Sequence, residues 1–174
     1  MDREIYSCKS WFRAKKKSTM SWSEAQARAA HASKQQYTVL VGSVDKPYCF
    51  LDVADKVIGV SFLDDHLRES LTYAFQETEP GRLFLTMAIY RKFDGNTDKV
   101  VSDTSYLLNP NGTIQIRMEV FNPHHLEISS SVSDISSNYS CMPDFGEYDD
   151  LIRVERIWIM PSLKDRSLIR INSH

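Results

Sequence analysis

Histidine beside carboxylates is the arrangement in this chain with the clearest capacity for acid–base chemistry. His66 directly follows Asp64 and Asp65, and His124 and His125 form an adjacent pair further along. A histidine oriented by a carboxylate works as a general base near neutral pH, and two histidines together would suit ribonuclease-like chemistry. However, Asp-Asp is also a common way to end a strand. We therefore interpret the first group as a turn, and an enzymatic role for Asp65, His66 and His124 is the weaker alternative.

The remaining motifs give little support to metal binding or nucleophilic catalysis. His124 and His125 have no cysteine or carboxylate ligand beside them, so a solvated turn fits better than a metal site. Cys8, Cys49 and Cys141 are odd in number and far apart, which argues against a disulfide framework and against zinc. The chain has no Gly-x-Ser-x-Gly motif and no glycine-rich phosphate loop. We expect no enzyme, no catalytic residues, no metal and no cofactor.

Length and composition narrow the class of protein. The 174 residues, 42% hydrophobic and 25% charged, fit one domain with a sizeable core. No apolar run approaches the ~20 residues that span a membrane. Asp2 and Glu4 stand where a secretory signal would have its apolar leader, and three separate cysteines suit a reducing compartment. We expect a cytoplasmic protein without a membrane partner.

The net charge of -2 conceals an uneven distribution. Residues 1–36 carry a net charge of +5, whereas residues 44–79 and 134–150 carry -5 each. Acidic surfaces disfavour nucleic acid and speed association with basic partners. The basic run 13–17, beside Trp11 and Phe12, is interpreted as a solvated terminal tail rather than a nucleic-acid or membrane contact. We predict a partner-binding role for eight acidic residues: Asp64, Asp65, Glu69, Glu77, Asp144, Glu147, Asp149 and Asp150.

An antiparallel sheet must position these residues, because strand patterns and turns alternate from residue 57 to residue 132. Residues 113–120 alternate apolar and polar side chains without a break, directly after the turn sequence Asn-Pro-Asn-Gly. Short connections between neighbouring strands imply an antiparallel meander. Strands are predicted at residues 37–41, 49–53, 57–63, 67–75, 82–93, 99–108, 113–121 and 126–132.

Three segments are harder to interpret. Residues 64–76 fit a strand better than the rival helix, which Asp64 would cap. Residues 151–160 fit either a strand or a short helix, ended by Pro161. Residues 133–150 are polar and rich in turn formers, and they are predicted to be an exposed connection.

A peripheral helix is predicted before the sheet. Ser21-Trp22-Ser23-Glu24 matches a capping box, and an alanine-rich stretch follows to about Gln36. The fold class is therefore α+β: an antiparallel β meander of six or more strands with one or two peripheral helices. We divide the chain into a basic N-terminal extension with a short helix, a β-rich domain and a C-terminal tail, at residues 1–36, 37–160 and 161–174.

A family resemblance adds to these patterns. It is carried by Val41-Gly42-Ser43, by Gly-Arg-Leu-Phe-Leu at 81–85, by Tyr-Leu-Leu-Asn-Pro-Asn-Gly-Thr at 106–113, and by the run 138–156 with Pro-Asp-Phe-Gly-Glu-Tyr-Asp-Asp-Leu-Ile-Arg. Over residues 37–156 the chain resembles small bacterial immunity proteins that are encoded beside polymorphic toxins. The resemblance implies inhibition of a cognate toxin by tight binding, often across its active site, and it assigns no catalytic residues.

Two functions follow as hypotheses. The leading one is an immunity protein that binds and neutralises a cognate bacterial toxin effector by occluding its active site; acidic surfaces would suit a nuclease or another basic-cleft enzyme. The alternative is a small-ligand-binding β-barrel or curved-sheet protein without catalytic activity. Its pocket would lie between two sets of apolar residues: Leu83, Leu85 and Met87 on one side, and Ile114, Ile116 and Met118 on the other. The sequence identifies neither the toxin nor the oligomeric state.

Overall fold

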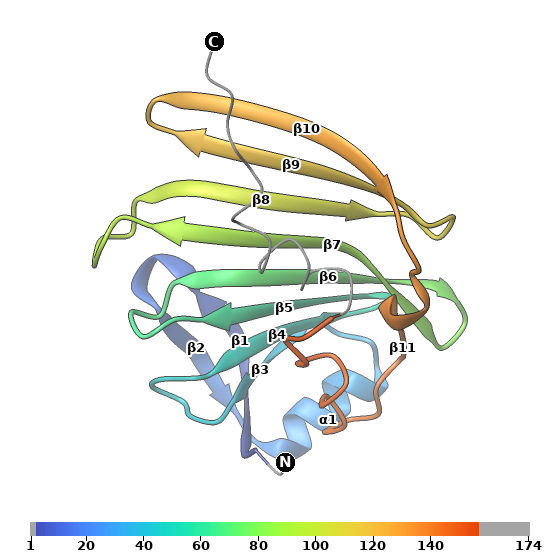
Figure 1. The fold of residues 1–174 in the computed structure, drawn as a ribbon. Coiled ribbons are helices and arrows are strands. Elements are labelled where there is room, and N and C mark those ends of the chain that lie inside the picture. The colour runs from blue at the N-terminus through green and yellow to red at the C-terminus, as the bar shows by residue number, and fades with distance from the viewer. Residues whose placement is uncertain (1–2, 157–174) are drawn as a thin grey trace.

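One antiparallel sheet of eleven strands forms the framework of the protein in the computed structural model, which describes residues 3–156 (Figure 1). The described part contains a single α-helix, so the antiparallel sheet is confirmed while the helical share is smaller than an α+β label implies. The elements are β1 (Ile5–Phe12), η1 (Arg13–Lys15), β2 (Lys17–Trp22), α1 (Glu24–Ala32), β3 (Tyr37–Val41), β4 (Cys49–Ala54), β5 (Val57–Leu63), β6 (Glu69–Glu79), β7 (Arg82–Phe93), β8 (Val100–Leu108), β9 (Thr113–Phe121), β10 (His124–Val132), η2 (Ser136–Asn138) and β11 (Tyr139–Cys141).

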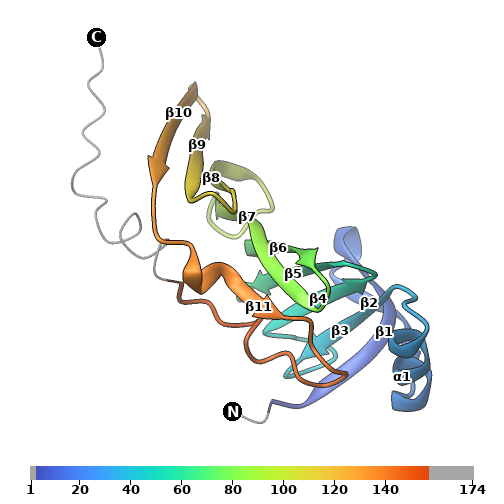
Figure 2. The ribbon, with the colours of Figure 1, turned by 90° about the vertical axis from the view of Figure 1, so that its right-hand side faces the viewer.

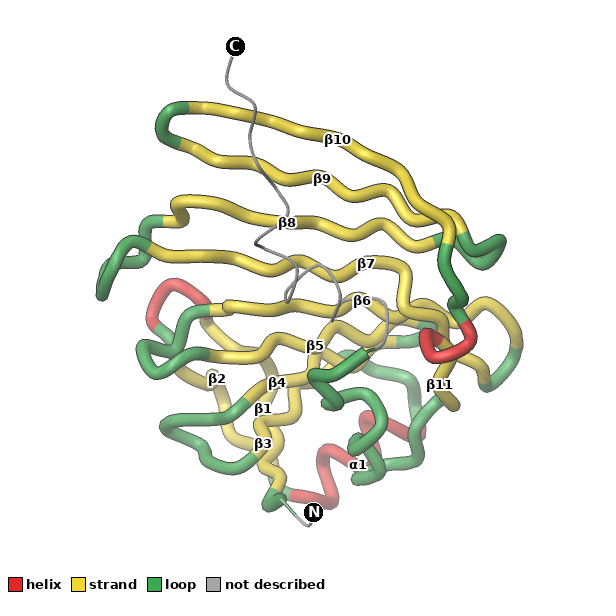
Figure 3. The backbone as a smooth tube through the Cα atoms, in the orientation of Figure 1, coloured by secondary structure: helices red, strands yellow, loops and turns green. Residues whose placement is uncertain are grey.

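The predicted meander is confirmed, since β3 to β10 are each hydrogen-bonded to the next strand along the chain. The strand alternative for residues 64–76 is also confirmed, although β6 begins only at Glu69. Leu67 adopts a positive φ of 57°, which belongs to a turn and delays the strand. Figure 3 shows how loops and turns occupy both ends of the sheet while strands run continuously between them.

The N-terminal segment differs from the predicted extension, because residues 5–22 form two strands of the same sheet. β1 pairs with β3 and with β2, which leaves β2 at one edge. Cys8 and Trp11 are buried, so this segment is not a solvated tail. Its polar residues hid the strand pattern, because a hairpin that contributes only a few side chains to a core needs few apolar positions.

The first strands of the meander are apolar on both sides, and the sheet therefore has two faces to cover. All five residues of β3 are buried. Cross-strand partners share a face, so Tyr37, Leu51 and Tyr73 lie on one side, the main face, and Leu40 and Phe50 lie on the other, the reverse face. Two separate clusters of buried residues correspond to these faces, a large one and a small one.

Helix α1 and residues 135–156 pack against the main-face cluster, and Figure 2 shows residues 135–156 along one side of the sheet. The Tyr37 and Tyr148 hydroxyls are 2.9 Å apart, and both rings are buried. Burial raises the pKa of both phenols, which keeps them neutral. The connection predicted to be exposed at 133–150 therefore contains a strand, β11, and a residue of the core.

The β1–β2 hairpin covers the reverse face. Trp11 stacks on Phe50 with ring centroids 5.5 Å apart. Beyond it, residues 12–17, the basic tip, reach across the sheet: Arg13 pairs with Asp52 and Glu69, and Lys16 pairs with Asp98. The basic run of the sequence is thus used for contacts within the chain.

Helix α1 is shorter than the alanine pattern predicted, and its capping box is shifted. Ser23, not Ser21, caps the helix, and Gln26 supplies the reciprocal contact. Ala27 and Ala30 are the residues that it buries. No helix among the described residues is long and apolar enough to cross a membrane. Residues 157–160 of the predicted strand or helix, and the predicted tail 161–174, lie outside the described residues.

Arg156 is a buried cation that joins the end of the described chain to the main face. Its guanidinium lies over the Tyr73 and Phe75 rings and donates hydrogen bonds to the Ser137 and Asp150 carbonyl oxygens. Burial lowers the pKa of Arg156 because the charged form loses its hydration. The carbonyl contacts and the two rings compensate for part of that loss.

Arg156→Leu should lower the free energy of unfolding by about 1–3 kcal/mol, because the partly buried Ser137 and Asp150 carbonyl groups lose their hydrogen-bond donor. The matched control is Arg153→Leu, since Arg153 is half exposed and makes a surface ion pair with Asp150, worth about 0–1 kcal/mol. Urea denaturation followed by circular dichroism measures both. Equal losses in the two variants would show that Arg156 does not fasten this segment.

Candidate functional site

The histidines considered for acid–base chemistry do not form a pair. His66 lies in the β5–β6 turn and His124 begins β10, so four strand spacings, about 19 Å, separate the two turns. His124 instead contacts Glu119, with Nε2 3.0 Å from the carboxylate. Asp64 accepts the His66 backbone N–H. Within the described residues, no cluster of three metal-ligating side chains exists.

The predicted ligand pocket between β7 and β9 is not formed by the residues proposed for it. β8 lies between these strands in one open sheet. Met87 pairs with Leu107 on the reverse face, whereas Ile116 pairs with Tyr106 on the main face. Leu83 and Leu85 are fully buried in the core. They pack in the same main-face cluster as Ile114 and Ile116, so these side chains fill the space in which a ligand would have to lie.

A different cavity, of about 340 Å³, opens between the β1–β2 hairpin, α1 and the loop after β11. Trp22, Leu40 and Phe145 give it apolar walls. The Glu24–Arg28 ion pair, 2.7 Å between nitrogen and oxygen, lies among the lining residues. Its volume is at the lower end of the range for small-molecule sites. Sequence reasoning missed this cavity because its walls come from segments far apart in the chain.

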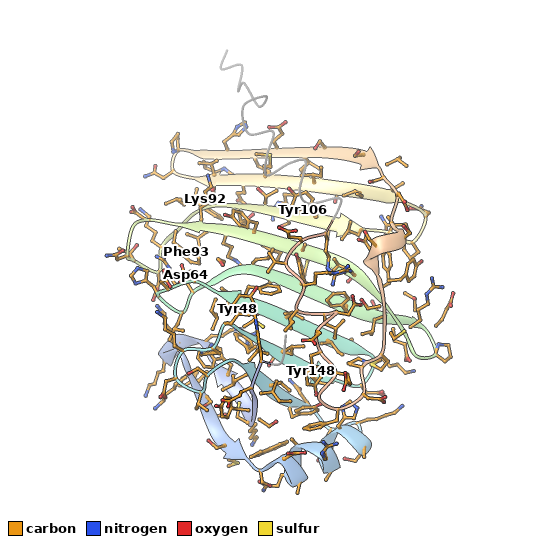
Figure 4. The ribbon with its side chains drawn as sticks, turned by 60° about the horizontal axis from the view of Figure 1, so that its bottom comes forward. Tyr48, Asp64, Lys92, Phe93, Tyr106 and Tyr148 are labelled. Carbon is orange, nitrogen blue, oxygen red and sulfur yellow. The ribbon has the colours of Figure 1, made fainter. Side chains whose placement is uncertain are left out.

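The eight acidic residues predicted to bind a partner separate into two groups. The first group lies at the β5–β6 turn, where Asp64 pairs with Arg68 at 2.7 Å, beside Phe93 (Figure 4). Glu69 pairs with Arg13 at 2.8 Å and also accepts the Ser61 hydroxyl. These two carboxylates are therefore engaged within the chain. Asp65 is 96% exposed and makes a longer ion pair, 3.7 Å, with Lys46.

The second group lies beyond β11. Residues 142–151, the acidic loop, carry Asp144, Glu147, Asp149 and Asp150, all of them exposed. The loop starts beside the β6–β7 turn, where the Met142 N–H donates to the Gly81 carbonyl. Glu77, the remaining member, lies on β6 next to this turn and accepts the Gly81 N–H.

Core side chains alternate with carboxylates along the acidic loop. Tyr148 and Leu151 are buried, and the Phe145 ring packs between Tyr37 and the Arg28 guanidinium. Figure 4 shows Tyr148 directed into the body of the protein. The alternation fixes the backbone, so the intervening carboxylates are held facing solvent rather than on a freely moving chain.

The carboxylates of the acidic loop are free to meet an external partner. Among the described residues, Asp144, Glu147 and Asp149 make no ion pair, and Asp150 pairs only with Arg153 at 3.4 Å. A fixed group of like charges raises the local concentration of oppositely charged ligands. The geometry of the loop therefore suits a basic protein surface.

A second charged group, on the reverse face, escaped the sequence analysis. Asp103 and Glu119 are directly opposite each other on β8 and β9, and Arg91 is opposite Asp103 on β7. Burial raises the pKa of Asp103, and the neighbouring Glu119 raises it further. One Asp103 oxygen is buried without a hydrogen bond from the described residues. Only the register between strands reveals this row, and the sequence does not contain the register.

Asp64 and Asp103 should respond oppositely when each is replaced by asparagine. Burial alone would raise the pKa of Asp64, but hydrogen bonds from Arg68 and the His66 backbone lower it below 3.8. Its charge therefore stabilises the fold above that pH, and the benefit is lost as the pH falls through the lowered pKa. The raised pKa of Asp103 means that its charge opposes folding as the pH rises.

At pH 7, Asp64→Asn should thus destabilise the protein and Asp103→Asn should leave it unchanged or stabilise it. The difference between the two variants should shrink as the pH falls below about 4, because Asp103 is then protonated and the stabilisation from the Asp64 charge is lost as the pH falls through its lowered pKa. Urea denaturation between pH 3 and pH 7 checks both signs. A loss of stability in Asp103→Asn at pH 7 would contradict the prediction.

Comparison of the chain with protein-family models, with curated proteins and with solved structures finds no match.

Proposed function

We propose that the protein is an immunity protein, which binds a cognate bacterial toxin in the cytoplasm and occludes its active site. The observation that carries the proposal is the acidic loop: Asp144, Glu147 and Asp149 are exposed and without ion pairs in the described chain, on a backbone fastened by Tyr148 and Leu151. A surface fixed before binding loses little conformational entropy when a partner docks. A toxin with a basic cleft, as in a nuclease, has the complementary charge.

The ion pairs of Asp64 and Glu69 favour the acidic loop over the β5–β6 turn as the docking surface. Asp64 and Glu69 already neutralise Arg68 and Arg13, so a partner would have to compete with those contacts. Reversing their charge would disturb the fold as well as the surface. Asp65, which pairs with Lys46 at 3.7 Å, would extend the acidic surface only at the opposite end of the sheet.

Reversal of the three free charges tests the proposal. The triple variant Asp144→Lys, Glu147→Lys and Asp149→Lys should slow association with the toxin encoded by the adjacent upstream gene by about ten- to a hundredfold at low salt, because steering is lost. Stopped-flow or surface-binding kinetics measure the rate. Growth of cells that express the toxin should fall in parallel.

The matched control reverses three exposed acids elsewhere, Asp45, Asp94 and Glu127, which also make no ion pair in the described chain, and so makes the same change in net charge. It should slow association much less, because the charges lie off the docking surface. Equal slowing by both triples would mean that only net charge matters. If the wild-type protein neither binds the adjacent product nor protects cells from it, the immunity function is wrong.

Small-ligand binding is the second candidate, favoured by the cavity of about 340 Å³ beside Trp22 and Leu40. The Arg28 side chain among its lining residues would suit a ligand with an apolar body and an acidic end. Titration with such compounds, followed through the NMR signal of the Trp22 indole, tests this candidate. Unchanged signals throughout the series would dismiss it.

A further inference from the structure

Strand β10 is an edge of the sheet that nothing in the described chain covers. It pairs with β9 along its whole length, and all nine of its residues are exposed. Leu126, Ile128 and Val132 are 41%, 57% and 77% exposed, although they are large apolar side chains. A long exposed edge of this kind is a template for pairing with another strand.

The hydrogen-bonding direction of β10 follows from its two ends. The Ser133 N–H donates to the Gly112 carbonyl, and the Asn109 N–H donates to the Thr113 carbonyl on the far side of β9. Because backbone groups alternate sides along an antiparallel strand, the odd-numbered residues of β10 bond to β9. The even-numbered residues direct their N–H and C=O groups outward: His124, Leu126, Ile128, Ser130 and Val132.

The opposite edge of the sheet, β2, is protected in ways that β10 is not. β2 is short, begins with Lys17 and is interrupted at Met20, where φ is 45°. Lysine and local distortion are the usual defences of an edge. β10 has no lysine, arginine or proline, no residue of positive φ and no irregularity in its register with β9.

We infer that β10 pairs antiparallel with β10 of a second copy of this chain, which joins two sheets across a twofold axis. The strand is complementary to itself. With the axis at Ile128, its only carboxylate, Glu127, lies opposite Ser129 of the other copy, so no like charges face each other. Cross-strand partners share a face, and the two Ile128 side chains therefore meet on the reverse face.

A second copy fits this edge better than a highly charged partner does. β10 carries one acid, two histidines and otherwise only Leu, Ile, Ser and Val. A neutral strand suits another neutral strand, and twofold pairing closes the assembly with each edge used once. The acidic loop lies beyond β11, away from the outer edge of β10, so the inference stands independently of the proposed function.

Mass and amide exchange together test the inference on the full chain. From micromolar to submillimolar concentration, sedimentation equilibrium should show the mass rising from 20.1 kDa towards twice that value. Over the same range, hydrogen exchange by NMR should slow at the Leu126, Ile128 and Ser130 amides. The odd-numbered amides should be protected at every concentration, because β9 already bonds them.

Ile128→Lys places two positive charges at the axis and should weaken self-association by at least about tenfold, an estimate from like charges in close contact. Val57→Lys is the control, since Val57 is a similarly exposed apolar residue at the start of β5, and it should leave self-association within about twofold, as expected of an exposed site outside the contact. Protection of the odd-numbered amides verifies that both variants fold.

Three results would overturn the inference. The first is a monomeric mass at every concentration. The second is a dimer whose even-numbered β10 amides still exchange rapidly, which would place the contact elsewhere. The third is protection of the even-numbered β10 amides in a monomer. Such protection would show that another part of the same chain covers β10, or that the toxin does so if it appears only after toxin binds.

Discussion

The burial of β3 and β4 on both faces is the constraint on which the rest of the structure depends. A sheet whose first strands are apolar on both faces must be covered on both faces, and a different segment of this chain covers each one. Helix α1 and the segment from η2 onward cover the main face, while the β1–β2 hairpin covers the reverse face. Towards β10 the apolar demand falls, and within residues 3–156 all nine residues of β10 are exposed.

This arrangement also decides which charges are available to a partner. The basic tip pairs with Asp52 and Glu69 of the first acidic stretch and with Asp98 beyond it, so these charges are neutralised within the chain. The second acidic stretch has no such counterpart, because its core residues hold it on the other side of the sheet. The fold therefore pairs basic residues from the beginning of the chain with acidic residues from its middle. The carboxylates of the acidic loop stay exposed.

Local signals predicted the meander well, since each hairpin between β6 and β10 is marked by its own turn residues, such as those at 109–112. The position of β1 between β2 and β3 could not be predicted in the same way, because alternation shows that a strand exists but not which strand it joins. The same limit hid the pairing of Asp103 with Glu119 and the burial of Arg156. For the site, the acidic residues of 144–150 were named from charge alone, whereas the absence of ion pairs at Asp144, Glu147 and Asp149 in the described chain follows only from where the described cationic side chains lie.

The distance along the chain between the basic tip and its partners has a consequence for biosynthesis. Lys16 and Asp98 are 82 residues apart, and ribosomes add about 5–20 residues per second. The tip therefore exists for roughly 4–16 seconds before its last carboxylate has been made, at those rates. The apolar partners of Trp11, which are Leu40, Phe50 and Leu63, are all made before Asp98, so the hairpin can form its apolar contacts before its last ion pair. A nascent chain of this protein would expose its cationic end to the ribosome's own acidic RNA while the sheet is still growing.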